Sequence, residues 1–87
     1  MNARALVARN LRRLRVRKGL SQEVIAVDAQ IDRTYVSRLE RGLENPTVAV
    51  LERLAKATDA QISEFFAIPR RGEPPPQPLR GGRRARR

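Results

Sequence analysis

One segment of this 87-residue chain, residues 32–41, concentrates polar and cationic side chains at helical spacing. At 100° per residue, a helix over this segment turns Val36 and Leu39 to one side. The remaining surface and the first turn carry Arg33, Thr34, Ser37, Arg38 and Arg41. An arginine can donate two hydrogen bonds to guanine O6 and N7, and a threonine methyl group suits a thymine methyl group. On an arbitrary helix, a solvated polar face is the better interpretation, so the wider context must decide between the two.

The sequence lacks two residue types that commonly serve in covalent catalysis and in metal binding. The chain contains no cysteine and no histidine, which removes disulfides, zinc sites built on thiolate or imidazole, and cysteine or histidine catalysis. A domain of this size buries only about 60% of its unfolded surface, which leaves little room for an interior active site. We therefore expect no enzyme, no metal and no cofactor.

Positive charge dominates the chain and is unevenly distributed. The net charge is +10 with a pI near 11.7, which indicates polyanionic partners, with nucleic acid first and an anionic membrane second. Residues 69–87 hold seven arginines and one glutamate, whereas residues 1–68 carry a net charge of only +4. No apolar run approaches the roughly 18 residues of a membrane span, so we expect a cytoplasmic protein without a membrane partner.

Proline and glycine divide the chain near Pro69. Residues 3–68 contain only Gly19, Gly42 and Pro46, whereas residues 69–87 contain five prolines and three glycines. We predict a folded domain over residues 1–68 and a disordered, partly polyproline II tail over residues 69–87. The tail arginines are either solubilising charge or a flexible arm that binds phosphates, and we favour the arm.

Apolar periodicity and capping residues predict five short helices and an all-α fold. The approximate ranges of four of them are 3–18, 22–29, 32–41 and 61–66. The fourth helix in chain order opens at residues 45–47, and Leu51, Leu54 and Ala55 form its buried face. The second and third, separated by a turn of three or four residues, have the proportions of a helix-turn-helix over about 21–41.

At the residue level, the chain resembles the phage repressor and Cro type helix-turn-helix family, also called the xenobiotic response element family. The matching residues lie between about 6 and 66: Leu11, Leu14, Arg15, residues 19–23, Ala26, residues 35–42, residues 45–47, Leu51, Leu54, Ala55, Phe65 and Phe66. Within the family, residues 32–37 are similar to the controller proteins of restriction–modification systems, which are dimeric regulators of their own operons. The resemblance implies a five-helix, lambda-repressor-like domain that regulates transcription from a palindromic operator.

The resemblance also implies roles for individual side chains. Gln22 matches a glutamine that contacts phosphate in the family, and Arg41 and Asn45 are the other expected phosphate contacts. For Arg41, an exposed cation favoured by the helix dipole is equally open. The expected base contacts follow from position on the helix surface and are Arg33, Thr34, Ser37 and Arg38. Arg15 and Glu40 match a partly buried ion pair that braces the recognition helix. Tyr35 lies at the border of the core and DNA faces, and packing and DNA contact are both open to it.

Family members dimerise so that two recognition helices meet successive turns of DNA, about 34–36 Å apart. Phe65, Phe66 and Ile68 form an apolar cluster at the end of the domain. We expect one phenylalanine to fill the core and the other to join a homodimer interface.

The sequence departs from the family pattern at two sites. Gln30 stands where many relatives have a glycine with positive φ, and Thr58 and Asp59 stand where relatives tend to have Leu-Gly. We expect slight strain at Gln30, and less at Asp59 because aspartate tolerates left-handed backbone.

Two alternative functions remain open. A DNA-binding antitoxin would use the same helix and bind a toxin through its tail, although the tail has only Leu79 and Ala85 as apolar anchors. An RNA-binding protein would use the arginine-rich tail, but that tail has no aromatic residue for stacking. The sequence does not distinguish a repressor from an activator that contacts RNA polymerase.

Overall fold

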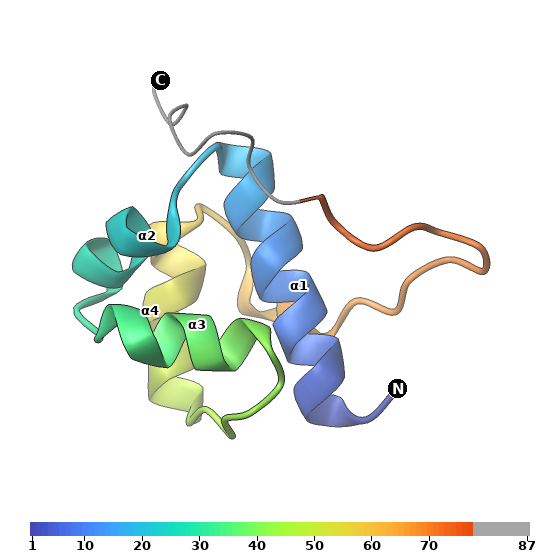
Figure 1. The fold of residues 1–87 in the computed structure, drawn as a ribbon, viewed down its shortest axis with the longest axis horizontal. Helices are drawn as coiled ribbons and strands as arrows, with labels where there is room; N and C mark the ends of the chain where they lie inside the picture. Colours follow the sequence, from blue (N-terminus) through green and yellow to red (C-terminus); the bar gives the residue numbers. More distant parts are fainter. Residues whose placement is uncertain (78–87) are drawn as a thin grey trace.

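Helices make up the regular structure of residues 1–77, the part of the chain that the computed structural model describes (Figure 1). The elements are α1 (Ala3–Lys18), α2 (Gln22–Ala29), α3 (Arg33–Glu40), α4 (Val48–Ala57) and the 3-10 helix η1 (Ile62–Phe66). No strand occurs within these 77 residues. The predicted all-α fold is thus confirmed. None of the described helices combines the length and the apolar character that crossing a membrane requires.

The fifth predicted helix is not an α-helix. Its five residues form a 3-10 helix that begins after Gln61, where the Glu64 carboxylate accepts from the Gln61 backbone N–H at 3.0 Å. Five residues allow too few i to i−4 hydrogen bonds to offset the cost of nucleating an α-helix, and the tighter 3-10 form is usual for such short pieces. The count is therefore four α-helices and one 3-10 helix in the described residues.

Side-chain caps fix where each α-helix begins. The capping residues are Asn2, Ser21, Asp32 and Thr47, and each accepts a hydrogen bond of 2.8–3.2 Å from a backbone N–H in the first turn. Replacing such a cap by alanine typically costs about 1 kcal/mol. The turn between α2 and α3 therefore ends at Asp32, the residue that caps α3.

Two residues other than glycine adopt left-handed backbone among residues 1–77, and both lie at sites where the sequence departs from the family pattern. Gln30 ends α2 with φ 60°, and Asp59 follows α4 with φ 57°. At Gln30 the backbone N–H closes the end of α2 by donating to Val27 O at 3.2 Å. The turn of the helix-turn-helix therefore requires the conformation that glycine adopts without cost.

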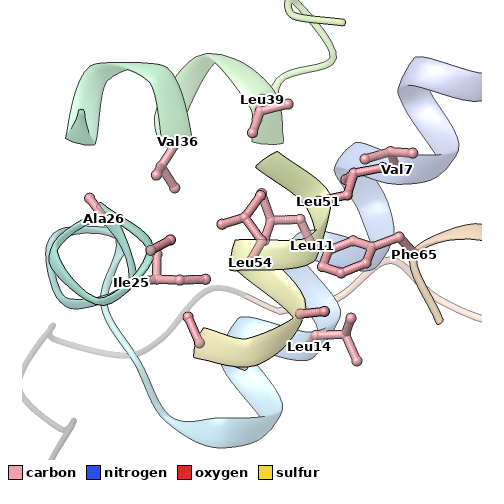
Figure 2. Close-up of a cluster of buried hydrophobic side chains, with 13 residues drawn as sticks. Val7, Leu11, Leu14, Ile25, Ala26, Val36, Leu39, Leu51, Leu54 and Phe65 are labelled. Carbon is pink, nitrogen blue, oxygen red and sulfur yellow. The ribbon is translucent and has the colours of Figure 1, made fainter. Parts of the chain in front are cut away.

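Aliphatic side chains from all four α-helices meet Phe65 of η1 in one core (Figure 2). Leu11, Leu14, Ile25, Leu54 and Phe65 are completely buried. In Figure 2, Leu54 of α4 lies between Ile25 of α2 and Leu11 of α1. The helix α4 packs on α2 and η1, whereas α3 packs on α1 and α2.

A buried asparagine attaches η1 to α1. The Asn10 side chain is fully buried, and its amide nitrogen donates to Phe65 O and Ala67 O, both at 2.9 Å. Its amide oxygen accepts from Arg13 Nε at 3.0 Å. With both ends of the amide satisfied, Asn10 secures the chain on each side of Phe66, a role that the sequence did not reveal.

Residues 69–77 return to α1 after η1. The Arg9 guanidinium, whose side chain is 9% exposed, donates to Pro74 O at 2.8 Å and lies 3.5 Å from a Glu73 carboxylate oxygen. Glu73 also accepts from the Arg70 backbone N–H at 2.9 Å, and that hydrogen bond, followed by the charge of Arg9, lowers its pKa. The first half of the predicted tail thus has defined contacts with the domain, while residues 78–87 lie outside the described residues.

Candidate nucleic-acid interface

One face of the helix α3 packs on the protein core, and the opposite face is exposed to solvent. Val36 and Leu39 point into the core with 0% and 1% exposure, and α3 packs on both α1 and α2. Figure 1 shows α2 and α3 joined by a short turn, with α4 behind them. The outward face of α3 is the face that the sequence assigned to base contacts.

The four predicted base-contact residues differ in solvent exposure and in their contacts within the protein. Arg33 and Thr34, in the first turn of α3, are exposed to solvent. Ser37 and Arg38 are partly exposed. Arg38 is tied to the loop after α3, because its Nε donates to Glu44 Oε2 at 2.6 Å. The four side chains thus lie on one helix, and Arg38 is held by Glu44, a partner that was not predicted from the sequence.

Tyr35 packs against the core while remaining partly exposed. Burial raises the pKa of its phenol, and the charge of Glu44 raises it further. The hydroxyl therefore stays protonated at neutral pH and can donate a hydrogen bond. The ring of Tyr35 therefore has a packing role, and its hydroxyl group is available to donate a hydrogen bond to a partner.

Glu40 is the centre of a polar network beneath α3. Its side chain is completely buried, and it accepts from Arg15 Nε at 2.5 Å and Arg15 Nη2 at 3.0 Å. Arg15 is itself only 7% exposed and also donates to Leu20 O at 2.8 Å. The pair implied by the family resemblance is present, and it joins α1, α3 and the start of the helix-turn-helix.

Two further donors complete this network. Arg12 Nε lies 3.2 Å and Gln22 Nε2 lies 3.1 Å from Glu40 Oε1. The role of Arg12 was not predicted from the sequence, although its position about one turn before Arg15 places the two side chains on neighbouring parts of the α1 surface. For Gln22, the predicted phosphate contact, the network fixes where the amide points.

The remaining predicted phosphate contacts lie beyond the far end of α3. Arg41 and Asn45 are both exposed and flank Gly42, which has φ 74°. They stand at the opposite end of α3 from Arg33, so the predicted contacts span the whole helix.

Comparison with known proteins gives the family. Residues 6–65 match the family model described as "Helix-turn-helix domain". The chain belongs to this helix-turn-helix family. The matched region contains the whole of α2, α3 and α4 and most of α1 and η1, and the resemblance noted in the sequence is confirmed.

Relatives of this helix-turn-helix chain are named as regulators. It is 47% identical over 57 residues to the uncharacterized HTH-type transcriptional regulator y4dJ of Sinorhizobium fredii, covering 66% of this chain and 74% of that protein. Its fold is similar to the restriction–modification controller protein C.AhdI from Aeromonas hydrophila, with a TM-score of 0.70, 40% identity, and coverage of 72% and 96%. It is also similar to the controller protein C.Esp1396I, crystallised as a tetramer with its natural 35-base-pair operator, with a TM-score of 0.69, 32% identity, and coverage of 76% and 87%.

At the end of this helix-turn-helix domain, the predicted apolar cluster divides. Phe65 has 0% exposure and fills the core, so it offers no surface to a partner. Phe66 is 47% exposed and Ile68 is 80% exposed. The surface available for dimerisation at this end of the domain therefore includes Phe66 and Ile68, but not Phe65.

Proposed function

We propose that the chain is a sequence-specific DNA-binding regulator of transcription that binds a palindromic operator as a homodimer, with α3 in the major groove. The observation that carries the proposal is the division of α3: Val36 and Leu39 anchor it in the core, while Arg33 and Thr34 extend into solvent at its first turn. The names of the relatives support this function, as does the operator complex of C.Esp1396I. A cytoplasmic location and the lack of catalytic activity, both expected from the sequence, are part of the proposal.

The base contacts are assigned to Arg33, Thr34, Ser37 and Arg38. A guanidinium can donate to guanine O6 and N7 at the same time, and each such pair discriminates against a wrong base by about 1–3 kcal/mol. Arg33 is free to make this contact from the first turn of α3, and the Thr34 methyl group suits a neighbouring thymine. Tyr35 can add a hydrogen bond from its hydroxyl.

The phosphate contacts are assigned to Gln22, Arg41 and Asn45, which lie around the base-contact residues. One amide proton of Gln22 is directed to Glu40 at 3.1 Å. A glutamine amide nitrogen carries two protons, so the second is available to a phosphate oxygen. Such contacts fix the register of the protein on DNA without reading the sequence.

The homodimer follows from the limits of a single module. One helix of eight residues reaches few base pairs, and two copies with α3 about 34–36 Å apart would meet successive turns of the same DNA face. Phe66 and Ile68 supply exposed apolar surface for such a contact.

Selection of binding sites from random DNA, followed by one substitution, tests the proposal. We expect a symmetric consensus, and Arg33→Ala should lose preference at one base pair in each half-site. Lys56→Ala is the matched control, because it removes one exposed positive charge from α4. A wild-type chain that enriches no sequence, or an Arg33→Ala variant that weakens specific and random DNA equally, would contradict the proposal.

A further inference from the structure

Glu44 lies in the loop after α3 and holds Arg38 by a single nitrogen. The Arg38 Nε donates to Glu44 Oε2 at 2.6 Å, and the two side chains are 43% and 29% exposed. The pair is therefore at the surface, on the face of α3 assigned to DNA, rather than in the buried network around Glu40. Nothing in the family resemblance or in the names of the relatives gives Glu44 a role.

The geometry of the pair leaves the two terminal nitrogens of the Arg38 guanidinium free. A guanidinium has five N–H donors, of which the Nε position supplies one and the two terminal nitrogens supply four. Among residues 1–77, the hydrogen bonds of the Arg38 side chain involve Nε alone. Its two terminal nitrogens are thus available to the paired acceptors of a guanine edge, O6 and N7.

The charge of Glu44 also determines which partner Arg38 favours. A free arginine at a DNA surface can bind any nearby phosphate, and that contact carries no sequence information. A carboxylate beside the guanidinium offsets its charge and repels phosphate oxygens, whereas the neutral guanine edge is not repelled in this way. The pairing therefore favours base contact over phosphate contact.

Glu44 also influences Tyr35, which lies on the same helix as Arg38. The charge of Glu44 is felt at the Tyr35 hydroxyl, where it adds to the effect of burial on the pKa. Glu44 thus lies close to two side chains on the proposed DNA face, Tyr35 and Arg38.

We propose that Glu44 is a positioning residue that makes Arg38 a reader of guanine rather than a contact for phosphate. This inference rests on the proposed function. Glu44 itself touches no base in this account and acts only through the orientation and charge of Arg38.

Four variants test the role of Glu44: Glu44→Gln, Arg38→Ala, the two combined, and Glu52→Gln as the control. Glu52 is exposed on α4, so its substitution changes the net charge equally without altering the pair. For each variant, base preference is measured by selection from random DNA. Affinity for a random-sequence duplex is measured as a function of salt, and thermal unfolding checks that the variants are folded.

We expect Arg38→Ala to abolish preference for guanine at one position in each half-site, a loss of roughly 5- to 150-fold. Glu44→Gln should weaken preference at the same position and bind the random duplex more tightly. Its slope of log affinity against log salt should steepen by about 0.9, which corresponds to one added phosphate contact. The combined variant should match Arg38→Ala at that position, and Glu52→Gln should resemble the wild type.

The outcomes separate the inference from the function on which it rests. A wild-type chain that selects no sequence would contradict the proposed function. A wild type that selects a sequence, with a folded Glu44→Gln variant that keeps full preference at the Arg38 position, would overturn the role of Glu44 alone. The inference also fails if the combined variant loses preference at a position that Arg38→Ala leaves intact.

Discussion

Replacing Glu40 by alanine removes the carboxylate on which the position of α3 depends. Glu40 accepts hydrogen bonds from Arg15, Arg12 and Gln22, and its side chain is completely buried. The substitution leaves these donors in place and removes their common acceptor.

The loss in the free energy of unfolding depends on whether each donor can form hydrogen bonds with water once Glu40 is removed. Arg12, with 35% of its side chain exposed, can turn toward solvent, whereas Arg15 is 7% exposed and cannot. Removing one partner of a buried ion pair typically costs about 3–5 kcal/mol, because the other charge remains buried and unpaired. Since domains are stable by only about 5–15 kcal/mol in total, Glu40→Ala should lose a large part of the free energy of unfolding.

Urea unfolding followed by helical circular dichroism measures this loss. Glu52→Ala, at an exposed position on α4, is the control and should stay within about 0.5 kcal/mol of the wild type. The double variant Arg15→Met with Glu40→Leu should be far less destabilised than Glu40→Ala, because it leaves no buried charge unpaired. A Glu40→Ala variant that loses less than about 1 kcal/mol would refute the reasoning.

Three further predictions concern the turn, pH and the tail. Gln30→Gly should stabilise the fold slightly. A left-handed residue other than glycine costs about 1–2 kcal/mol, and the greater flexibility of glycine in the unfolded chain offsets only part of this gain. A loss of stability in urea unfolding would contradict the account of strain. The Gln61 backbone N–H, followed by the charge of Arg17, lowers the pKa of Glu64. Glu64 therefore contributes stability at pH values above its unfolded-state pKa, and this contribution is lost as the pH falls through its folded-state pKa. The Glu64→Gln variant should lose less stability on acidification than the wild type does. Equal losses in the two proteins would contradict this account. Truncation after Gln77 removes five arginines and keeps the contacts of Glu73. It should lower the affinity for random DNA and flatten the salt dependence of binding without changing base preference. An unchanged salt slope would show that these arginines do not contact DNA phosphates.

The features predictable from the sequence were those with local causes. Ser21 and Asp32 cap the helices that follow them because their side chains reach the first free N–H groups, an interaction within a few residues. The positive φ of Gln30 was predictable because the family pattern places glycine there. The buried sides of α3 and α4 followed from helical spacing alone.

The features that escaped prediction depend on contacts between distant residues. Asn10 is buried because it meets the backbone carbonyls of Phe65 and Ala67, and no pattern around Asn10 marks it as different from a surface asparagine. The pairing of Arg38 with Glu44 depends on the path of the loop after α3, which spacing on the helix does not describe.

Methylation interference on the selected operator tests most directly whether α3 enters the major groove. Methyl groups at guanine N7 obstruct the major groove, whereas those at adenine N3 obstruct the minor groove. Our account predicts interference at guanine N7 in two half-sites, with centres about 10 base pairs apart on one face of the DNA, and loss of part of this pattern in Arg33→Ala. Interference confined to adenine N3, or a pattern unchanged by Arg33→Ala, would contradict it.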